Sequence, residues 1–305
     1  MNPLRGIGLK VLSVLVFIGM AVCIKASAPH VPPGERVFFR SFFAIPVILI
    51  WLAWTGGLRG GLETLYPLGH VWRGLVGTSG MALGFTALGL LPLPEATALA
   101  YAAPLLTVVF AAMFLGEQVR AFRLTAVGVG LVGVMIVLWP RMTLGAEATS
   151  AQTVGAMAAL LGAAFAALAQ VFVRKLITTE ATATIVFYFS LTATVLSLVT
   201  IPFGWVVPTA REAALLVAAG ILGGVGQILL TESYRNAEAG TIAPFEYVSM
   251  LFAILLGYLV FEEVPTATML AGAALIVAAG LFILWRERRL GIQRANARKV
   301  MTPQG

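Results

Sequence analysis

Charged side chains inside apolar segments are the residues of this sequence that are best suited to chemistry. Glu246 lies within a long apolar run, two residues after Pro244. An ionisable group at the centre of a membrane helix costs about 2.5–3.5 kcal/mol on insertion scales, so it should face a bundle interior or a watery cavity. A proline removes a backbone donor and can leave carbonyl groups accessible nearby. We therefore predict a substrate or proton site at Glu246 and the adjacent Tyr247, with a structural ion pair to an arginine as the alternative.

Basic side chains also occur in the first two apolar runs. Arg40 lies several residues into the second run, and Arg36 precedes it by four residues. Residues four apart share a helix face, so this pair could hold an anion or pair with a carboxylate, although Arg36 could equally extend to the outer surface. Lys25 ends the first run and either faces a cavity or extends to the membrane surface. Arg40 and Lys25 are therefore candidate substrate-binding residues.

Two amides and two tyrosines complete the candidate site. Gln170 and Gln227 lie in apolar runs, where an amide can bind a substrate or join two helices by hydrogen bonds. Tyr101 and Tyr247 could flank a cavity as aromatic surfaces or pack within the core. The predicted substrate-binding set therefore contains these four residues together with Glu246, Arg40 and Lys25.

The sequence shows none of the arrangements expected of an enzyme or a metal protein. His30 and His70 stand far apart with no cysteine cluster nearby, which does not support a metal site. We find no Ser/His/Asp arrangement, phosphate-binding loop or catalytic carboxylate pair. Residues 128–133 match G-x-G-x-x-G, but they lie inside an apolar run rather than between a strand and a helix, which favours helix packing. We predict no catalytic activity, no metal and no cofactor.

The composition indicates an integral membrane protein. Hydrophobic residues make up 60% of the 305 residues and charged residues 11%, against about 45–50% and about 25% in soluble domains. The net charge is +7, but the basic residues are scattered or gathered at the C-terminus, as expected beside a membrane rather than for binding nucleic acid. No polar segment is long enough to fold as a separate domain.

Uncharged runs predict ten transmembrane helices. A cytoplasmic N-terminus puts fifteen of the twenty basic residues on the cytoplasmic side, so we predict a multi-pass protein of the inner membrane with both termini in the cytoplasm. Residues 26–28 resemble a signal-peptide cleavage site, but we expect the first run to be retained as the first span. The predicted spans are 9–27, 34–54, 71–91, 94–115, 122–139, 152–173, 183–205, 212–234, 239–261 and 265–285.

An internal repeat relates the two halves of the chain at an offset of 146 residues. Each half holds five spans, an odd number, so the second half should cross the membrane in the opposite direction. Inverted repeats of this kind are typical of secondary transporters, whose substrate binds near the bilayer midplane. We predict five-helix repeats at 5–139 and 152–287 and a basic cytoplasmic tail at 288–305. The matched residues are Gly74, Gly77 and Gly80 with Gly220, Gly223 and Gly226, and Tyr101 with Tyr247.

The chain resembles the EamA family of drug/metabolite transporters over residues 5–287. The fourth span of each half ends in a similar motif, at 114–117 (Phe-Leu-Gly-Glu) and at 260–263 (Val-Phe-Glu-Glu). Ala243-Pro244 followed by Tyr247, and Lys25 ahead of an arginine in the second span, also resemble this family. The resemblance implies an alternating-access bundle whose central cavity is lined by spans one, three, four, six, eight and nine.

Residues 32–41 are similar to the bacterial riboflavin transporters within that family. The sequence therefore predicts a secondary transporter, with riboflavin uptake as the first choice and export of amino acids or related metabolites as the alternative. A flavin needs stacking surfaces and hydrogen-bond partners. An amino acid needs partners for both its charges, which Arg40 or Lys25 could supply together with Glu246. The predicted partners are a small-molecule substrate and membrane lipids, no nucleic acid is expected, and a homodimer is left open.

Overall fold

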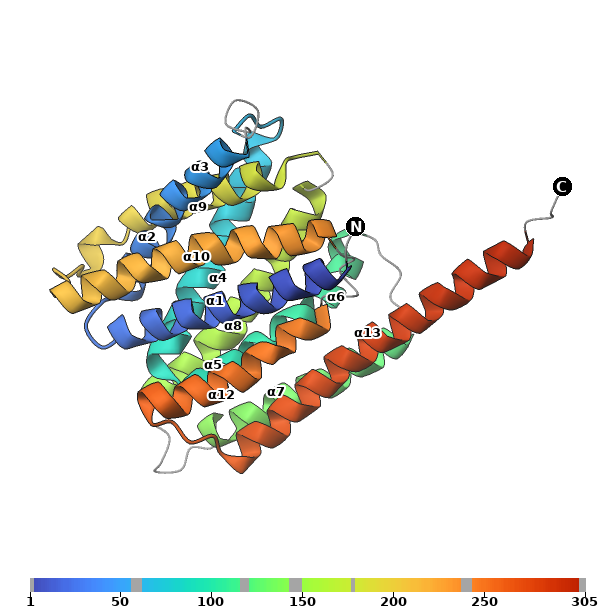
Figure 1. Ribbon diagram of the computed structural model, residues 1–305. Coiled ribbons are helices and arrows are strands. Elements are labelled where there is room, and N and C mark those ends of the chain that lie inside the picture. The colour runs from blue at the N-terminus through green and yellow to red at the C-terminus, as the bar shows by residue number, and fades with distance from the viewer. Residues whose placement is uncertain are drawn as a thin grey trace.

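The computed structural model describes residues 3–55, 62–115, 121–142, 150–176, 179–236 and 243–301 as a bundle of helices (Figure 1). Regular structure in these residues is helical throughout, without a strand. Six helical segments in this part of the chain, two of them made of two consecutive helices, are long and apolar enough to cross a membrane, so the protein is a multi-pass membrane protein. They are Leu4–Ser27, Pro33–Trp54, Leu93–Phe114, Ser150–Val173, Ala210–Leu230 and Ala267–Arg286.

Prolines begin several helices of the first half, because the first helical position has no need of an N–H group. Pro33 and Pro67 occupy such positions. The helices of this half are α1 (Pro3–Ser27), α2 (Pro33–Phe42), α3 (Ala44–Trp54), α4 (Pro67–Leu90), α5 (Leu93–Ala100), α6 (Ala102–Leu115) and α7 (Ala121–Met142).

In the second half, as in the first, long helices alternate with spans that consist of shorter elements. It ends in a helix that continues to Met301, where the sequence predicted a tail after residue 287. Its elements are α8 (Ser150–Leu176), α9 (Thr182–Leu198), the 3-10 turn η1 (Ile201–Phe203), α10 (Ala210–Asn236), the 3-10 turn η2 (Ala243–Tyr247), α12 (Val248–Phe261) and α13 (Ala267–Met301).

Three of the predicted spans are interrupted. The second is divided at Phe43 between α2 and α3, and the fourth is divided at Tyr101 between α5 and α6. Pro104 has no N–H group to bond the carbonyl of Ala100, which accounts for the break in the fourth span. The ninth begins as η2, which ends at Tyr247. Tyr101 and Tyr247 are matched by the sequence repeat, so the fourth and ninth spans are irregular at related positions.

Three long helix pairs organise the bundle: α1 with α10, α4 with α8, and α7 with α13. Figure 1 shows α7 and α13 along one side, and α1 begins at the same end of the bundle at which α13 runs out. A Cβ atom on Gly133 of α7 would lie 2.8 Å from the carbonyl oxygen of Gly272. Only glycine therefore allows the backbones of α7 and α13 to approach this closely.

The repeated glycines contact repeat-related helices. Gly74 and Gly77 of α4 lie against Thr192 and Phe189 of α9, the seventh predicted span. Their partners Gly220 and Gly223 of α10 lie against α2, in the second predicted span. The second and seventh spans occupy equivalent places in the two halves. These contacts support the inverted repeat, and the inversion and the count of ten spans stay predictions.

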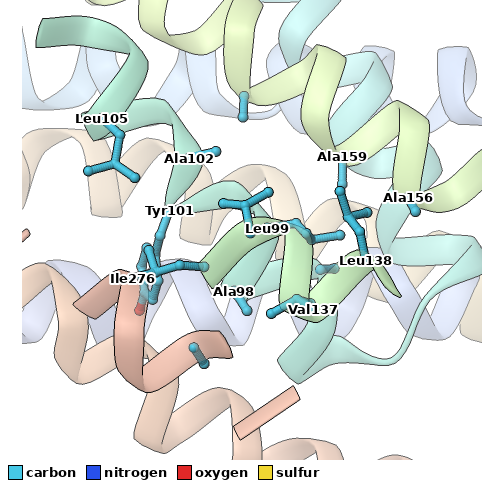
Figure 2. Close-up of a cluster of buried hydrophobic side chains, with 14 of the residues drawn as sticks. Ala98, Leu99, Tyr101, Ala102, Leu105, Val137, Leu138, Ala156, Ala159 and Ile276 are labelled. Atoms are coloured by element: carbon cyan, nitrogen blue, oxygen red, sulfur yellow. The ribbon is translucent and has the colours of Figure 1, made fainter. Parts of the chain in front are cut away.

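Tyr101 belongs to the largest apolar cluster in the described part of the chain. Figure 2 shows Tyr101 at the join of α5 and α6 together with Leu99 and Leu105, which belong to those two helices. The same cluster includes Val137 of α7 and Ile276 of α13. The apolar core therefore surrounds the break in the fourth span, next to which the candidate site lies.

Candidate functional site

Lys10 and Glu246 form an ion pair between α1 and the start of the ninth span. The Lys10 side chain is 2% exposed, whereas that of Glu246 is 46% exposed. A buried ammonium needs a counter-charge, which Glu246 provides. From the sequence, Lys10 is one of the basic residues counted on the cytoplasmic side, because it lies one residue after the start of the first predicted span, but the structure buries its side chain.

Tyr101 and Tyr247 meet beside this ion pair. Their rings lie 5.1 Å apart at an angle of 72°, an edge-to-face arrangement. The Tyr101 hydroxyl is in hydrogen-bond contact with Ser249 Oγ, and Ser249 Oγ donates to the Glu246 carbonyl at 2.7 Å. The structure therefore brings three predicted site residues together and adds Lys10 and Ser249. We call these five residues the ion-pair site.

Lys25 forms a second ion pair near the other end of α1. Its Nζ lies 2.9 Å from Glu263 Oε1 and donates to the Leu91 carbonyl at 2.5 Å. Fifteen residues separate Lys10 from Lys25, which is about 22 Å along a helix. Glu246 and Glu263 lie at the two ends of the ninth span. Ion pairs thus join α1 to this span at both ends, and Lys25 is not an extended surface side chain.

Arg40 is buried in α2, at a distance from the ion-pair site. Its side chain is 4% exposed, and its guanidinium carbon lies 5.8 Å from the centre of the Phe189 ring on α9. Arg73 of α4 lies 3.7 Å from the centre of the same ring. From the sequence, Arg73 is one of the basic residues counted on the cytoplasmic side, because it lies near the beginning of the predicted span 71–91. The structure instead brings it to the same aromatic ring as Arg40.

Arg36 is also buried, and its predicted extension to the outer surface is wrong. Its Nη1 donates to the carbonyl of Phe85 at 2.9 Å, which ties α2 to α4. Glu95, near the beginning of the fourth predicted span, is buried as well.

Gln170 and Gln227 are not brought to the ion-pair site. Gln170 is exposed on α8, and Gln227 is half-buried on α10. No hydrogen bond joins either amide to the other predicted residues in the part of the chain that the structure describes. Their predicted role in substrate binding therefore has no support from the geometry, and it stays a prediction.

Glu180 lies in the connection between α8 and α9. Its carboxylate accepts hydrogen bonds from Thr64 Oγ1 at 2.8 Å and from the backbone N–H groups of Leu65 at 2.8 Å and Tyr66 at 3.1 Å. Burial raises the pKa of the Glu180 carboxyl, but these hydrogen bonds outweigh burial and lower the pKa below its usual value. Glu180 therefore anchors the segment that leads into α4.

The side chains that could hold a metal ion are dispersed. Where the structure describes them, no three His, Cys, Asp or Glu side chains gather at one place. His30 contacts Glu212, and His70 contacts Glu180, in two separate pairs.

The sequence as a whole matches one family model twice. The model described as the EamA-like transporter family matches residues 4–139 and again residues 153–285. The chain belongs to the EamA-like transporter family. The resemblance stated from the sequence is thereby confirmed, and the EamA chain is a transporter rather than an enzyme.

Named relatives of this EamA chain differ in their cargo. It is 35% identical to the pseudopaline exporter of Pseudomonas aeruginosa, over 90% of this chain and 94% of that protein. It is 29% identical to the S-adenosylmethionine uptake transporter of Rickettsia bellii, over 93% and 94%. It is also 29% identical to the riboflavin transporter of Rhizobium johnstonii, over 85% and 83%. Membership of the family therefore leaves both the substrate and the direction of transport open.

Proposed function

We propose that this EamA transporter is a secondary transporter that moves a small zwitterionic metabolite, such as an amino-acid derivative, by alternating access. The observation that carries the proposal is the Lys10–Glu246 ion pair within the ion-pair site. A zwitterion offers the same two charges as this pair. Its carboxylate can replace Glu246 at Lys10, and its ammonium group can replace Lys10 at Glu246, so neither charge of the pair is left without a partner.

The position of the ion-pair site supports this proposal. Discontinuous helices at matching places in two halves of a transporter commonly mark its binding site. Tyr101 and Tyr247 lie at such breaks in the fourth and ninth spans, and they flank Glu246. The interrupted backbone also provides polar groups beside the ion pair, because the Glu246 carbonyl accepts a hydrogen bond from Ser249.

The two ion pairs of α1 suggest how access could alternate. Lys10 with Glu246 and Lys25 with Glu263 join α1 to opposite ends of the ninth span. Release of one pair while the other holds would open the bundle to one side only. Alternating access requires this kind of exclusive opening.

Riboflavin uptake, the first choice from the sequence, has less support from the geometry than transport of a zwitterion has. A relative named as a riboflavin transporter favours it. However, the two tyrosines that were expected to stack on a flavin pack against each other, and Tyr101 is buried. The exporter prediction is favoured by the 35% identical relative, which is named as an exporter. We therefore propose export of the zwitterionic metabolite.

Transport by the purified protein in liposomes tests the substrate class. S-adenosylmethionine, which carries an amino-acid end, and riboflavin, which does not, serve as labelled probes in counterflow. We expect protein-dependent exchange of the amino-acid compound, and inhibition of that exchange by other amino-acid derivatives. Exchange of riboflavin without exchange of any amino-acid compound would reject the zwitterion proposal in favour of the flavin. The direction of transport is then determined from the net flux of the substrate in cells that express the protein.

A charge swap separates a substrate-binding pair from a structural one. Lys10→Glu combined with Glu246→Lys keeps an ion pair, so folding should be largely retained. Transport should still be lost, because the charges now face the substrate in the reverse order. Glu262→Gln is the matched control, because Glu262 is exposed and follows the same span. Full transport by the charge swap would show that the pair is only structural.

A further inference from the structure

Two guanidinium groups lie against one aromatic ring inside the bundle. Arg40 comes from α2 and Arg73 from α4, and the ring is that of Phe189 on α9. Contact with a ring face stabilises a cation, but the two arginines are also close enough for their positive charges to repel. Two positive charges therefore share one aromatic ring in the interior of a membrane protein, and the contact with the ring only partly offsets their mutual repulsion.

Several nitrogen atoms of these arginines have no hydrogen-bond partner. Nε and Nη1 of Arg40 and Nε and Nη1 of Arg73 are buried without one. No ion pair connects either arginine with a carboxylate in the described part of the chain, where Glu246 and Glu263 pair with lysines and Glu180 contacts Thr64 and His70. A buried charge without a partner is strongly unfavourable, so the arrangement calls for an anion.

Glycines leave room for both guanidinium groups. A Cβ atom on Gly223 of α10 would lie 3.0 Å from Arg40 Nε, and a Cβ atom on Gly77 of α4 would lie 3.2 Å from Arg73 Nη1. Gly77 and Gly223 are a matched pair in the sequence repeat. Each half of the chain thus supplies one small residue beside one of the two cations. A larger side chain at either position would fill space next to the unpartnered nitrogen atoms.

This place is distinct from the ion-pair site. The Gly223 position that contacts Arg40 also lies next to Met20 of α1. Met20 follows Lys10 by ten residues, which is about 15 Å along the helix. The two places are therefore successive positions along α1.

We propose that Arg40 and Arg73 form an anion-binding site that receives a carboxylate of the transported metabolite. Guanidinium groups bind planar carboxylates through paired hydrogen bonds, and the Phe189 ring leaves the nitrogen edges of both groups free to donate. The inference rests on the proposed function, because a transported amino-acid derivative supplies the carboxylate. It adds a second binding site for the transported metabolite. At this site the substrate, and not the protein, supplies the negative charge that pairs with the two arginines.

Thermal unfolding of the purified full-length protein tests this site without any transport assay. The probes are sodium acetate, succinate, phosphate and chloride at equal ionic strength. Ligands that prefer the folded state raise its apparent stability. We expect the carboxylates to stabilise the protein more than chloride or phosphate does. Arg40→Gln and Arg73→Gln should each raise the half-saturating concentration of succinate by about tenfold or more.

Three further variants control for structural effects. Arg211→Gln removes an exposed arginine at the start of α10 and should leave the succinate response unchanged. Gly223→Ala keeps both arginines but should weaken binding, because its Cβ atom approaches Arg40 Nε. Arg40→Lys keeps the charge but loses the paired donors, so it should restore only part of the response. Without added anion, Arg40→Gln should unfold at the same or a higher temperature than the wild type, whereas loss of a purely structural arginine would lower it.

The outcomes also separate this inference from the proposed function. An unchanged succinate response in both arginine variants would overturn the site. An arginine-dependent response as strong with phosphate or chloride as with succinate would overturn the carboxylate assignment, because the site would then take a free inorganic anion. Absence of zwitterion exchange in liposomes, together with an arginine-dependent succinate response, would reject the proposed substrate class and keep the anion site.

Discussion

Gly280 of α13 determines how closely Tyr247 can approach that helix. A Cβ atom at this position would lie 1.7 Å from the Tyr247 hydroxyl oxygen, so any larger residue would displace the ring. Because Tyr247 packs edge to face on Tyr101, such a shift would be transmitted to the ion-pair site. The position of a glycine on a peripheral helix thus controls an aromatic pair in the interior.

We expect Gly280→Ala to destabilise the protein by roughly 1–3 kcal/mol, the usual cost of inserting atoms into a packed interior. Thermal unfolding in detergent measures the effect. Gly128→Ala is the matched control, because Gly128 also lies within a long helix and a Cβ atom there would meet nothing within 4 Å. Equal stability of the two variants would contradict the close contact between Gly280 and Tyr247.

Glu180 predicts a pH dependence of stability. Its pKa is lowered in the folded protein, so its contribution is present above the carboxyl pKa of the unfolded chain and is lost as pH falls through the lower folded value. We expect Glu180→Gln to be less stable than the wild type at neutral pH. The difference should shrink as the solution becomes acidic. Unfolding temperatures measured from neutral to acidic pH test this, and a difference that does not change with pH would rule it out.

Sequence reasoning located part of the candidate site and missed the rest for an identifiable reason. Glu246 and the two tyrosines were found because a carboxylate in an apolar run is costly and because the tyrosines match in the repeat. Lys10 and Arg73 were missed because charge near the end of a span is the pattern of a surface anchor. Which face of a helix such a side chain takes depends on packing between segments far apart in the chain.

At the scale of elements, α1 is the helix that both ion pairs hold. Lys10 and Lys25 join it to the two ends of the ninth span, and α10 packs along its length. Ser13 Oγ of α1 also donates to the Gly226 carbonyl of α10 at 3.2 Å. Relative motion of α1 and the ninth span must therefore break one of two defined contacts.

We expect Lys25→Met and Glu263→Gln to reduce transport to a similar extent, because each removes the same ion pair. The double variant should be little worse than either single variant, since residues in direct contact give non-additive effects. Transport per folded molecule in liposomes is the measurement, with Glu262→Gln as the control. Losses that simply add in the double variant would show that Lys25 and Glu263 act separately.

The interruptions of the helices were harder to predict than the helices themselves. Long apolar runs fix the existence of a span, because about 20 such residues cross the hydrocarbon core. Pro104 and Pro46 lie three residues after the breaks at Tyr101 and Phe43, and each lacks the N–H group that would bond the carbonyl four residues before it. Continuous hydrophobicity is the same for a straight and a broken span, so these prolines, and not the apolar runs, are the local signal of the two breaks.

For the whole molecule, the end of the bundle at which α1 begins is also that at which α13 runs out (Figure 1). Combined with the segregation of basic residues, this arrangement predicts that both termini lie in the cytoplasm. Reporter fusions at the C-terminus and in each connection test the prediction. A C-terminal fusion that reports an external location, or a mature protein that begins after Ala28, would contradict it.

The overall architecture was largely accessible from the sequence, because membrane helices and their repeat are both encoded locally. Apolar composition predicted an all-helical membrane protein, and the helical bundle confirms that. The matched glycines predicted equivalent roles for α4 and α10, which the contacts of Gly77 and Gly223 support. The neighbours of each helix could not be predicted, since α1 packs on a helix that follows it by about 200 residues.

The pairing of Lys10 with Glu246 also sets an order of events during synthesis. At about 5–20 residues per second, a ribosome needs roughly 10–50 s to add the 236 residues between them. Until then, Lys10 of α1 lacks the carboxylate with which it pairs in the folded protein. Helix α10, which packs along α1, ends ten residues before Glu246 and is therefore completed only shortly earlier. A chain truncated before residue 246 leaves the buried ammonium group of Lys10 without this counter-charge.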